Sequence, residues 1–65
     1  MATKIEQYEN RLLKAIQLHY PKVRDSDFQE YYSDETNANK AARAGEKVIF
    51  IQSFGMYCVI NENAL

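Results

Sequence analysis

The sequence predicts an α+β domain in which an amphipathic N-terminal helix packs on a small antiparallel sheet built around a C-terminal β-hairpin. Two observations carry this prediction. Apolar residues recur at three- and four-residue steps between residues 5 and 20, which is the period of one helix face. Two runs rich in β-branched and aromatic residues, 47–52 and 56–60, flank Ser53-Phe54-Gly55 and are typical of paired strands.

The first helix is expected to begin at a capping box and to end before a proline. Thr3 and Glu6 have the spacing at which each side chain satisfies the backbone amide of the other residue. The apolar positions that follow at helical spacing are Ile5, Tyr8, Leu12, Ile16 and either His19 or Tyr20. Because Pro21 disfavours helical backbone at Tyr20, the helix is expected to end within residues 18–20.

Residues 22–32 admit two interpretations. A capping pattern that starts at Ser26 fits a short helix, whereas Phe28, Tyr31 and Tyr32 suit a short strand. The strand is favoured, because an edge strand beside the hairpin gives the three strands that make a sheet independently stable.

A short alanine-rich second helix is predicted over residues 34–44. Ser33 or Asp34 supplies its N-cap, and Gly45 is suited to the left-handed conformation that stops a helix. Alanine methyl groups bury little area, so this helix is expected to shield less of the sheet than the first helix does. The polar residues 61–65 are expected to fray.

The predicted hairpin is apolar on both faces. If Phe54-Gly55 is a two-residue turn, the facing pairs on one side are Ile51 with Cys58 and Ile49 with Ile60. The other side carries Val48, Phe50, Tyr57 and Val59. A hairpin with one solvated face alternates apolar and polar residues, so this hairpin needs cover on both sides. A chain of 65 residues offers little cover, which predicts a partner or a second copy.

Size and composition indicate a single globular domain, 1–65, in the cytoplasm. The chain is 46% hydrophobic and 26% charged, which is typical of folded proteins. A net charge of −1 gives no overall attraction to nucleic acid or to anionic membranes. No apolar run approaches the roughly 18 residues of a membrane span, and no secretory leader is recognisable. The lone Cys58 is consistent with a reducing compartment.

The chemically reactive residues give no enzyme signature, so no catalytic residue, cofactor or metal ion is expected. Cys58 lies between apolar strand residues and is interpreted as a small inert core residue. His19 is interpreted as a residue that covers the end of the first helix. The acidic residues of the middle segment lack the glycine and glutamate spacing of an EF-hand loop. Phosphate-binding glycine loops, HExxH and paired CxxC are also absent from the sequence.

The leading hypothesis is a small non-catalytic interaction module, such as a regulator, adaptor or inhibitor. It would bind a protein partner or a second copy through Phe50, Phe54, Tyr57 and Val59. The alternative is a nucleic-acid-associated factor, with Tyr31 and Tyr32 as stacking surfaces. Its phosphate contacts would come from Lys22, Arg24, Lys40, Arg43 and Lys47. A subunit of a larger complex is a third possibility.

Overall fold

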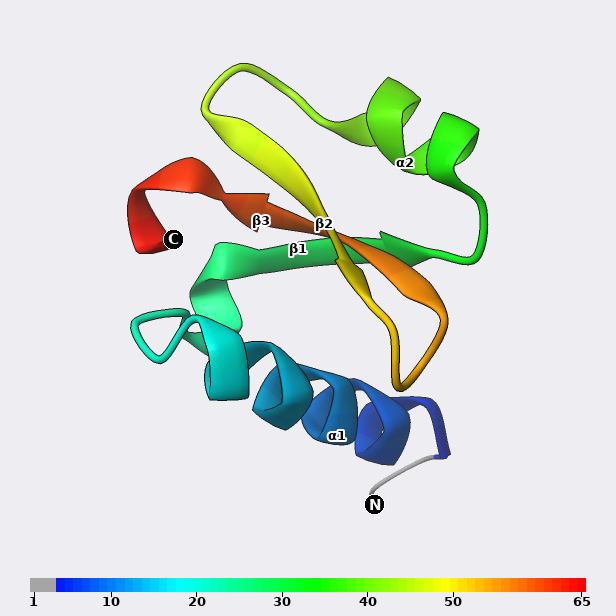
Figure 1. Cartoon of the computed structure of the whole chain (residues 1–65), viewed down its shortest axis with the longest axis vertical. Coiled ribbons are helices and arrows are strands. Elements are labelled where there is room, and N and C mark those ends of the chain that lie inside the picture. Colours follow the sequence, from blue (N-terminus) through cyan, green and yellow to red (C-terminus); the bar gives the residue numbers. More distant parts are fainter. Residues whose placement is uncertain (1–3) are drawn as a thin grey trace.

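The chain forms a three-stranded antiparallel sheet with one α-helix on each face (Figure 1). The computed structural model describes residues 4–65. Its elements in chain order are α1 (Lys4–His19), η1 (Asp25–Asp27), β1 (Phe28–Tyr32), α2 (Glu35–Ala41), β2 (Glu46–Ile51), β3 (Met56–Asn61) and η2 (Glu62–Ala64), where η marks a 3-10 helix. The predicted α+β architecture, with a C-terminal hairpin and a short second helix, is confirmed.

Helix α1 presents its apolar stripe to the sheet. Leu12 and Ile16 are fully buried, one turn apart, in the core cluster between α1 and the strands. The helix ends at His19, as the following Pro21 predicts, and the Gln17 side-chain amide donates to the Val23 carbonyl, which holds the chain after the helix in place. The predicted capping residue Thr3 lies outside the described residues. Within residues 4–65, neither helix has the length and apolarity needed to cross a bilayer.

The ambiguous segment before residue 33 contains the predicted strand, preceded by one short 3-10 turn. Strand β1 pairs antiparallel with β3. Its register shifts between Phe28 and Glu30, so Gln29 is an extra residue that forms a bulge. The Asp27 carboxylate accepts from the backbone amide of Arg24, which stabilises the turn before the strand. The sheet order is β1-β3-β2, so β3 is central and both β1 and β2 are edge strands.

The hairpin register differs from the predicted one by two residues. Ile51 lies opposite Met56, and Ile49 lies opposite Cys58, because residues 52–55 form a four-residue turn instead of a two-residue turn. Gly55 has a φ of 64° in this turn, and its amide donates to the Ile51 carbonyl at 2.8 Å. A slip of two residues keeps every side chain on its face, so the predicted faces are correct although the predicted pairs are wrong.

Helix α2 is shorter than predicted, and it does not stop at the glycine. The Asp34 carboxylate accepts from the Asn37 amide at 3.1 Å and caps the first turn. The helix ends at Ala41, and Ala42 is already extended. Gly45, with a φ of 84°, belongs to the turn that starts β2, where a left-handed residue is required.

The C-terminal residues are ordered, which corrects the expectation that they fray. Strand β3 continues to Asn61. The Glu62 amide donates to the Gly45 carbonyl at 2.8 Å, which adds one hydrogen bond next to the pair of Glu46 with Asn61. The 3-10 turn η2 then brings Ala64 into the core cluster, where it is 7% exposed. Residues 61–65 therefore help to cover the sheet.

Both faces of the central strand are covered within one molecule. Cys58 and Ile60 belong to the core cluster on the α1 side, whereas Val59, which points to the other side, is also 0% exposed. Ala38 of α2 is likewise fully buried, and α2 contacts β1 and β3. The two helices therefore supply most of the cover that the sequence argument assigned to a partner, and the accessible apolar surface is correspondingly smaller.

Ile16 and Leu18 on α1 have side chains of the same size but opposite exposure, so they provide a matched test of this packing. Ile16→Ala removes a fully buried side chain and is expected to lower the free energy of unfolding by about 2–5 kcal/mol. Leu18→Ala, at a position 83% exposed, is expected to change it by no more than about 0.5 kcal/mol. Urea denaturation followed by circular dichroism measures both values. Equal losses for the two variants would contradict the described orientation of α1.

Candidate interaction surface

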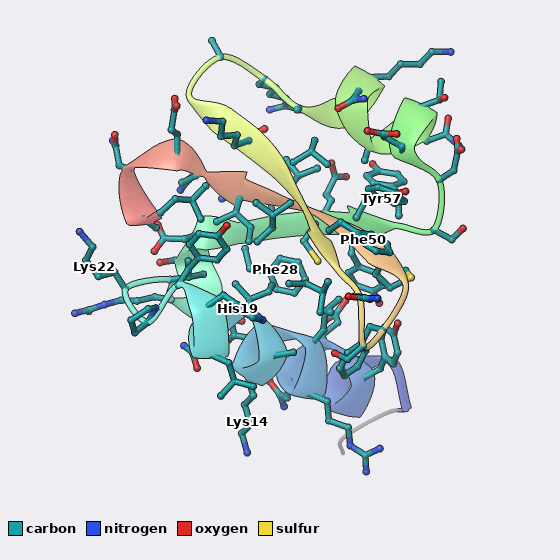
Figure 2. The ribbon with its side chains drawn as sticks, in the orientation of Figure 1. Lys14, His19, Lys22, Phe28, Phe50 and Tyr57 are labelled. Atoms are coloured by element: carbon teal, nitrogen blue, oxygen red, sulfur yellow. The ribbon has the colours of Figure 1, made fainter. Side chains whose placement is uncertain are left out.

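The largest apolar side chain that the sheet leaves open to solvent is Phe50 of β2, which is 50% exposed. Its ring packs on Tyr57 of β3, the residue directly opposite, with the ring centroids 4.7 Å apart and the planes at 39° (Figure 2). Val48 lies two residues before Phe50 on the same face and is half-buried. We call Val48, Phe50 and Tyr57 the Phe50 patch.

The Phe50 patch stays accessible because α2 covers the same face of the sheet over β1 and β3, away from β2. In the order β1-β3-β2, the main contacts of α2 are with β1 and β3. The helix is seven residues long, and its buried residue is Ala38, so it does not reach across to cover a phenylalanine on the far edge strand. The patch is therefore a direct result of a short, alanine-rich helix.

Two of the four predicted partner-binding residues do not lie on this surface. Val59 shares the face of Phe50 but is fully buried, so it supports the patch from within. Phe54 lies on the α1 side and packs against the core cluster. Phe50 and Tyr57 are the two of these four residues that the structure brings together on an accessible surface.

Phe54 packs on Tyr8 of α1, although its position at a hairpin tip gave no indication of a packing partner within the chain. Its ring meets Tyr8 of α1 edge-on, with centroids 5.5 Å apart and planes at 69°. Tyr8 also packs against Tyr31 of β1, with centroids 5.6 Å apart. The four-residue turn thus directs Phe54 toward the start of α1, and the ring joins the hairpin to the helix.

The lone cysteine is a core residue. Cys58 is 0% exposed, and burial raises the pKa of its thiol to about 12, so the thiolate needed for nucleophilic attack is scarce at neutral pH. Its neighbours across the sheet are Ile49 and Tyr31. This environment agrees with the interpretation of Cys58 as a small apolar residue.

The basic residues of the nucleic-acid alternative are spread over separate parts of the molecule. Lys22 and Arg24 lie in the loop after α1, whereas Lys40 and Arg43 lie in and just after α2, on the opposite side of the sheet (Figure 1). The Nζ of Lys47 is 3.7 Å from a carboxylate oxygen of Glu62. These positions do not form one continuous cationic track.

The two tyrosines of that alternative do not form one stacking surface either. Tyr31 lies opposite Cys58 on the α1 side of the sheet, and Tyr32 lies opposite Tyr57 on the α2 side. Burial raises the pKa of Tyr31, with a further contribution from the Glu9 carboxylate. Partial burial also raises the pKa of Tyr32, to which Glu30 contributes. Both hydroxyls therefore stay protonated at neutral pH.

The remaining polar side chains link neighbouring segments and do not form a metal site among the described residues. The second oxygen of the Asp27 carboxylate accepts from the Asn61 side-chain amide at 3.3 Å, which links the start of β1 to the end of β3. Arg24 and Lys22 line an open hollow of about 520 Å³ beside Asp27. Among the described residues, no three histidine, cysteine, aspartate or glutamate side chains gather as metal ligands do.

Sequence reasoning missed Val48 as an accessible residue and missed the importance of strand order. Val48 and Val59 look equivalent in the sequence, since both lie on the same hairpin face. Only the order β1-β3-β2 makes Val59 central and leaves Val48 on an edge. The low volume of the alanine-rich segment was the one sequence signal for incomplete cover.

The contact between Tyr8 and Phe54 is tested by a double-mutant cycle. Tyr8→Ala and Phe54→Ala are each expected to destabilise the fold, and the pair is expected to show a coupling energy of about 0.5–1.5 kcal/mol. Urea denaturation of the four proteins gives this value. Strict additivity of the two losses would mean that Phe54 does not pack on α1.

The thiol of Cys58 is tested by its alkylation rate. Because burial raises its pKa to about 12, iodoacetamide at neutral pH is expected to modify the folded protein far more slowly than the urea-unfolded chain. Mass spectrometry over time measures both rates. Comparable rates in the folded and unfolded protein would contradict the buried position of Cys58.

Comparison of the chain with protein-family models, with curated proteins and with solved structures finds no significant match.

Proposed function

We propose that this chain is a small non-catalytic protein–protein interaction module that binds through the Phe50 patch. The proposal is supported by one observation above the others. Phe50 is 50% exposed although it packs on Tyr57, and it lies on the edge strand β2, whereas the main contacts of α2 are with β1 and β3. Exposed aromatic side chains held by a rigid neighbour are typical anchors of protein interfaces.

The position of the patch favours binding by burial of apolar area. Phe50 and Tyr57 already pack together in the free chain, so little side-chain entropy is lost when a partner covers them. An interface of the usual size takes about 800 Å² from each partner. That is roughly one sixth of the 4790 Å² exposed by the described residues, so one binding surface would occupy a large share of the molecule.

The other exposed groups support this proposal and its cytoplasmic setting. Leu18 is more exposed than Phe50, but it lies in the last turn of α1 and does not belong to the Phe50 patch. The only cysteine is buried and free, which suits a reducing compartment such as the cytoplasm. We expect the Phe50 patch, and not Leu18, to determine which proteins the module binds.

The experiment compares Phe50→Ser with Leu18→Ser, which removes the other exposed large apolar side chain. Each protein carries a short-range cross-linker and is incubated with native lysate, and the linked proteins are quantified by mass spectrometry. The wild type and Leu18→Ser are expected to capture the same set of proteins. Phe50→Ser is expected to lose these by roughly 30-fold or more, because a central aromatic anchor contributes at least about 2 kcal/mol.

Circular dichroism and urea denaturation of the same three proteins provide the folding control. The two serine variants replace exposed side chains and are expected to unfold near the wild-type midpoint. Equal capture by Phe50→Ser and the wild type would overturn the proposal, as would capture that depends on Leu18.

A further inference from the structure

We propose that the free edge of β2 pairs antiparallel with β2 of a second copy of this chain. The two three-stranded sheets would then form one six-stranded sheet across a two-fold axis at Ile49. This inference rests on the proposed function, because it names the partner that covers the Phe50 patch.

The backbone of β2 exposes hydrogen-bonding groups at its outer edge. The Glu62 amide donates to the Gly45 carbonyl, so Gly45 directs its polar groups at β3. Along an antiparallel strand, successive residues direct their backbone N–H and C=O groups to alternate sides. The backbone groups of Lys47, Ile49 and Ile51 therefore also point to β3, and those of Val48 and Phe50 point to the outer edge. The N–H and C=O groups of Val48 and Phe50 are thus available to a further strand.

Beyond Glu46 and Lys47 at its start, β2 lacks the features that protect sheet edges from pairing. Its register with β3 is regular, and residues 48–51 contain no charged residue, proline or glycine. Figure 1 shows β2 crossing in front of β1 and β3, with neither helix in front of it. The next strand therefore has open access to this edge.

The opposite edge of the sheet is protected. Strand β1 is interrupted by its bulge, and Gln29 turns its side-chain amide to the Ser26 carbonyl. The hollow along this edge is also lined by Glu9, Asp25 and Glu30, whose charges would repel a second copy of the same edge. The contrast between the two edges directs pairing to β2.

A two-fold axis at Ile49 makes the β2 edge complementary to itself. Val48 then lies opposite Phe50 of the second copy, and Phe50 lies opposite Val48, so both residues exchange backbone hydrogen bonds. The two Phe50 patches meet on one face of the joined sheet, while the two Ile49 side chains meet on the other face. This register places Val48 of the second copy beside Phe50, so it covers part of the exposed ring and satisfies the free edge in one contact.

The charges at the ends of β2 are compatible with this register. Glu46 would face Gln52 of the second copy, and Lys47 would face Ile51, so no like charges lie directly opposite one another. Lys47 already has Glu62 of its own chain beside it. A second copy is therefore the occupant that we assign to this edge.

The first test measures mass in solution by sedimentation equilibrium at up to about 1 mM protein, where even a Kd of that order leaves much of the protein dimeric. The wild type is expected to approach twice the chain mass of 7.6 kDa. Phe50→Lys is expected to weaken dimerisation by at least about tenfold, because it places two charges inside the joined apolar surface. Leu18→Lys, at the exposed site on α1, is expected to dimerise as the wild type does.

The second test determines the register by disulfide formation. Both variants carry Cys58→Ala, because the native thiol lies directly opposite residue 49 of the same chain and would compete for the disulfide. Ile49→Cys chains are then expected to link rapidly under oxidised glutathione, because facing residues of a non-hydrogen-bonded pair have Cα atoms about 4.5 Å apart, within disulfide reach. Lys47→Cys is the matched control on the same strand and face. Its thiol would lie roughly 13 Å along the strand from its counterpart, too far to link within the dimer.

Circular dichroism confirms that each variant is folded before these measurements. A wild type that stays monomeric at about 1 mM would overturn the inference, as would equal dimerisation of Phe50→Lys or faster linking of Lys47→Cys. If the wild type is monomeric but captures another protein through Phe50, the proposed function stands and the second copy is excluded. If neither association occurs, both proposals fail.

Discussion

The structure depends on the need to cover a central strand that is apolar on both sides. Cys58, Val59 and Ile60 are consecutive residues of β3, so they point alternately to opposite faces, and all three are 0% exposed. A strand of this kind is stable in water only when both faces carry another layer. The positions of α1, α2 and the C-terminal turn follow from this requirement.

The cover is unequal because the two helices differ in length and in side-chain volume. Helix α1 has 16 residues and buries Leu12 and Ile16, and its face also receives Val23 and Ala64. Helix α2 has seven residues and buries Ala38. Apolar burial scales with the area removed from water, so the α2 side retains exposed apolar surface at the strand that is farthest from the helix. The Phe50 patch results from this unequal cover, whereas the edge of β2 is open because β2 is the last strand in the order β1-β3-β2.

This arrangement also relates the small size of the chain to its proposed association. A domain of about 60 residues buries only about 60% of the surface that its unfolded chain exposes, so its stability margin is narrow. The described residues contain no disulfide or metal cluster that would add to this margin. Pairing at the β2 edge would extend the sheet and cover Phe50 without any change in the core of either copy.

The site was less predictable than the fold, because the site depends on which strand lies at the edge. Periodicity correctly assigned Phe50 and Tyr57 to one face, and it placed Val59 beside them. It contained no information on where α2 would lie, so a buried Val59 and an exposed Phe50 were indistinguishable. The direction of Phe54 also depended on a residue far away in the sequence, since Tyr8 lies 46 positions earlier, at the other end of the chain.

The sequence by itself determined the elements and the hairpin faces, because these follow from local periods, capping residues and proline. It therefore identified α1, its end before Pro21 and the two faces of the hairpin, and it favoured a third strand within residues 22–32 without fixing its bounds. Tertiary structure decided the four-residue turn, the strand order, the early end of α2 and the ordered C-terminus. The strand order, the ordered C-terminus and the direction of Phe54 in the turn are set by contacts between distant segments, which local preference does not decide.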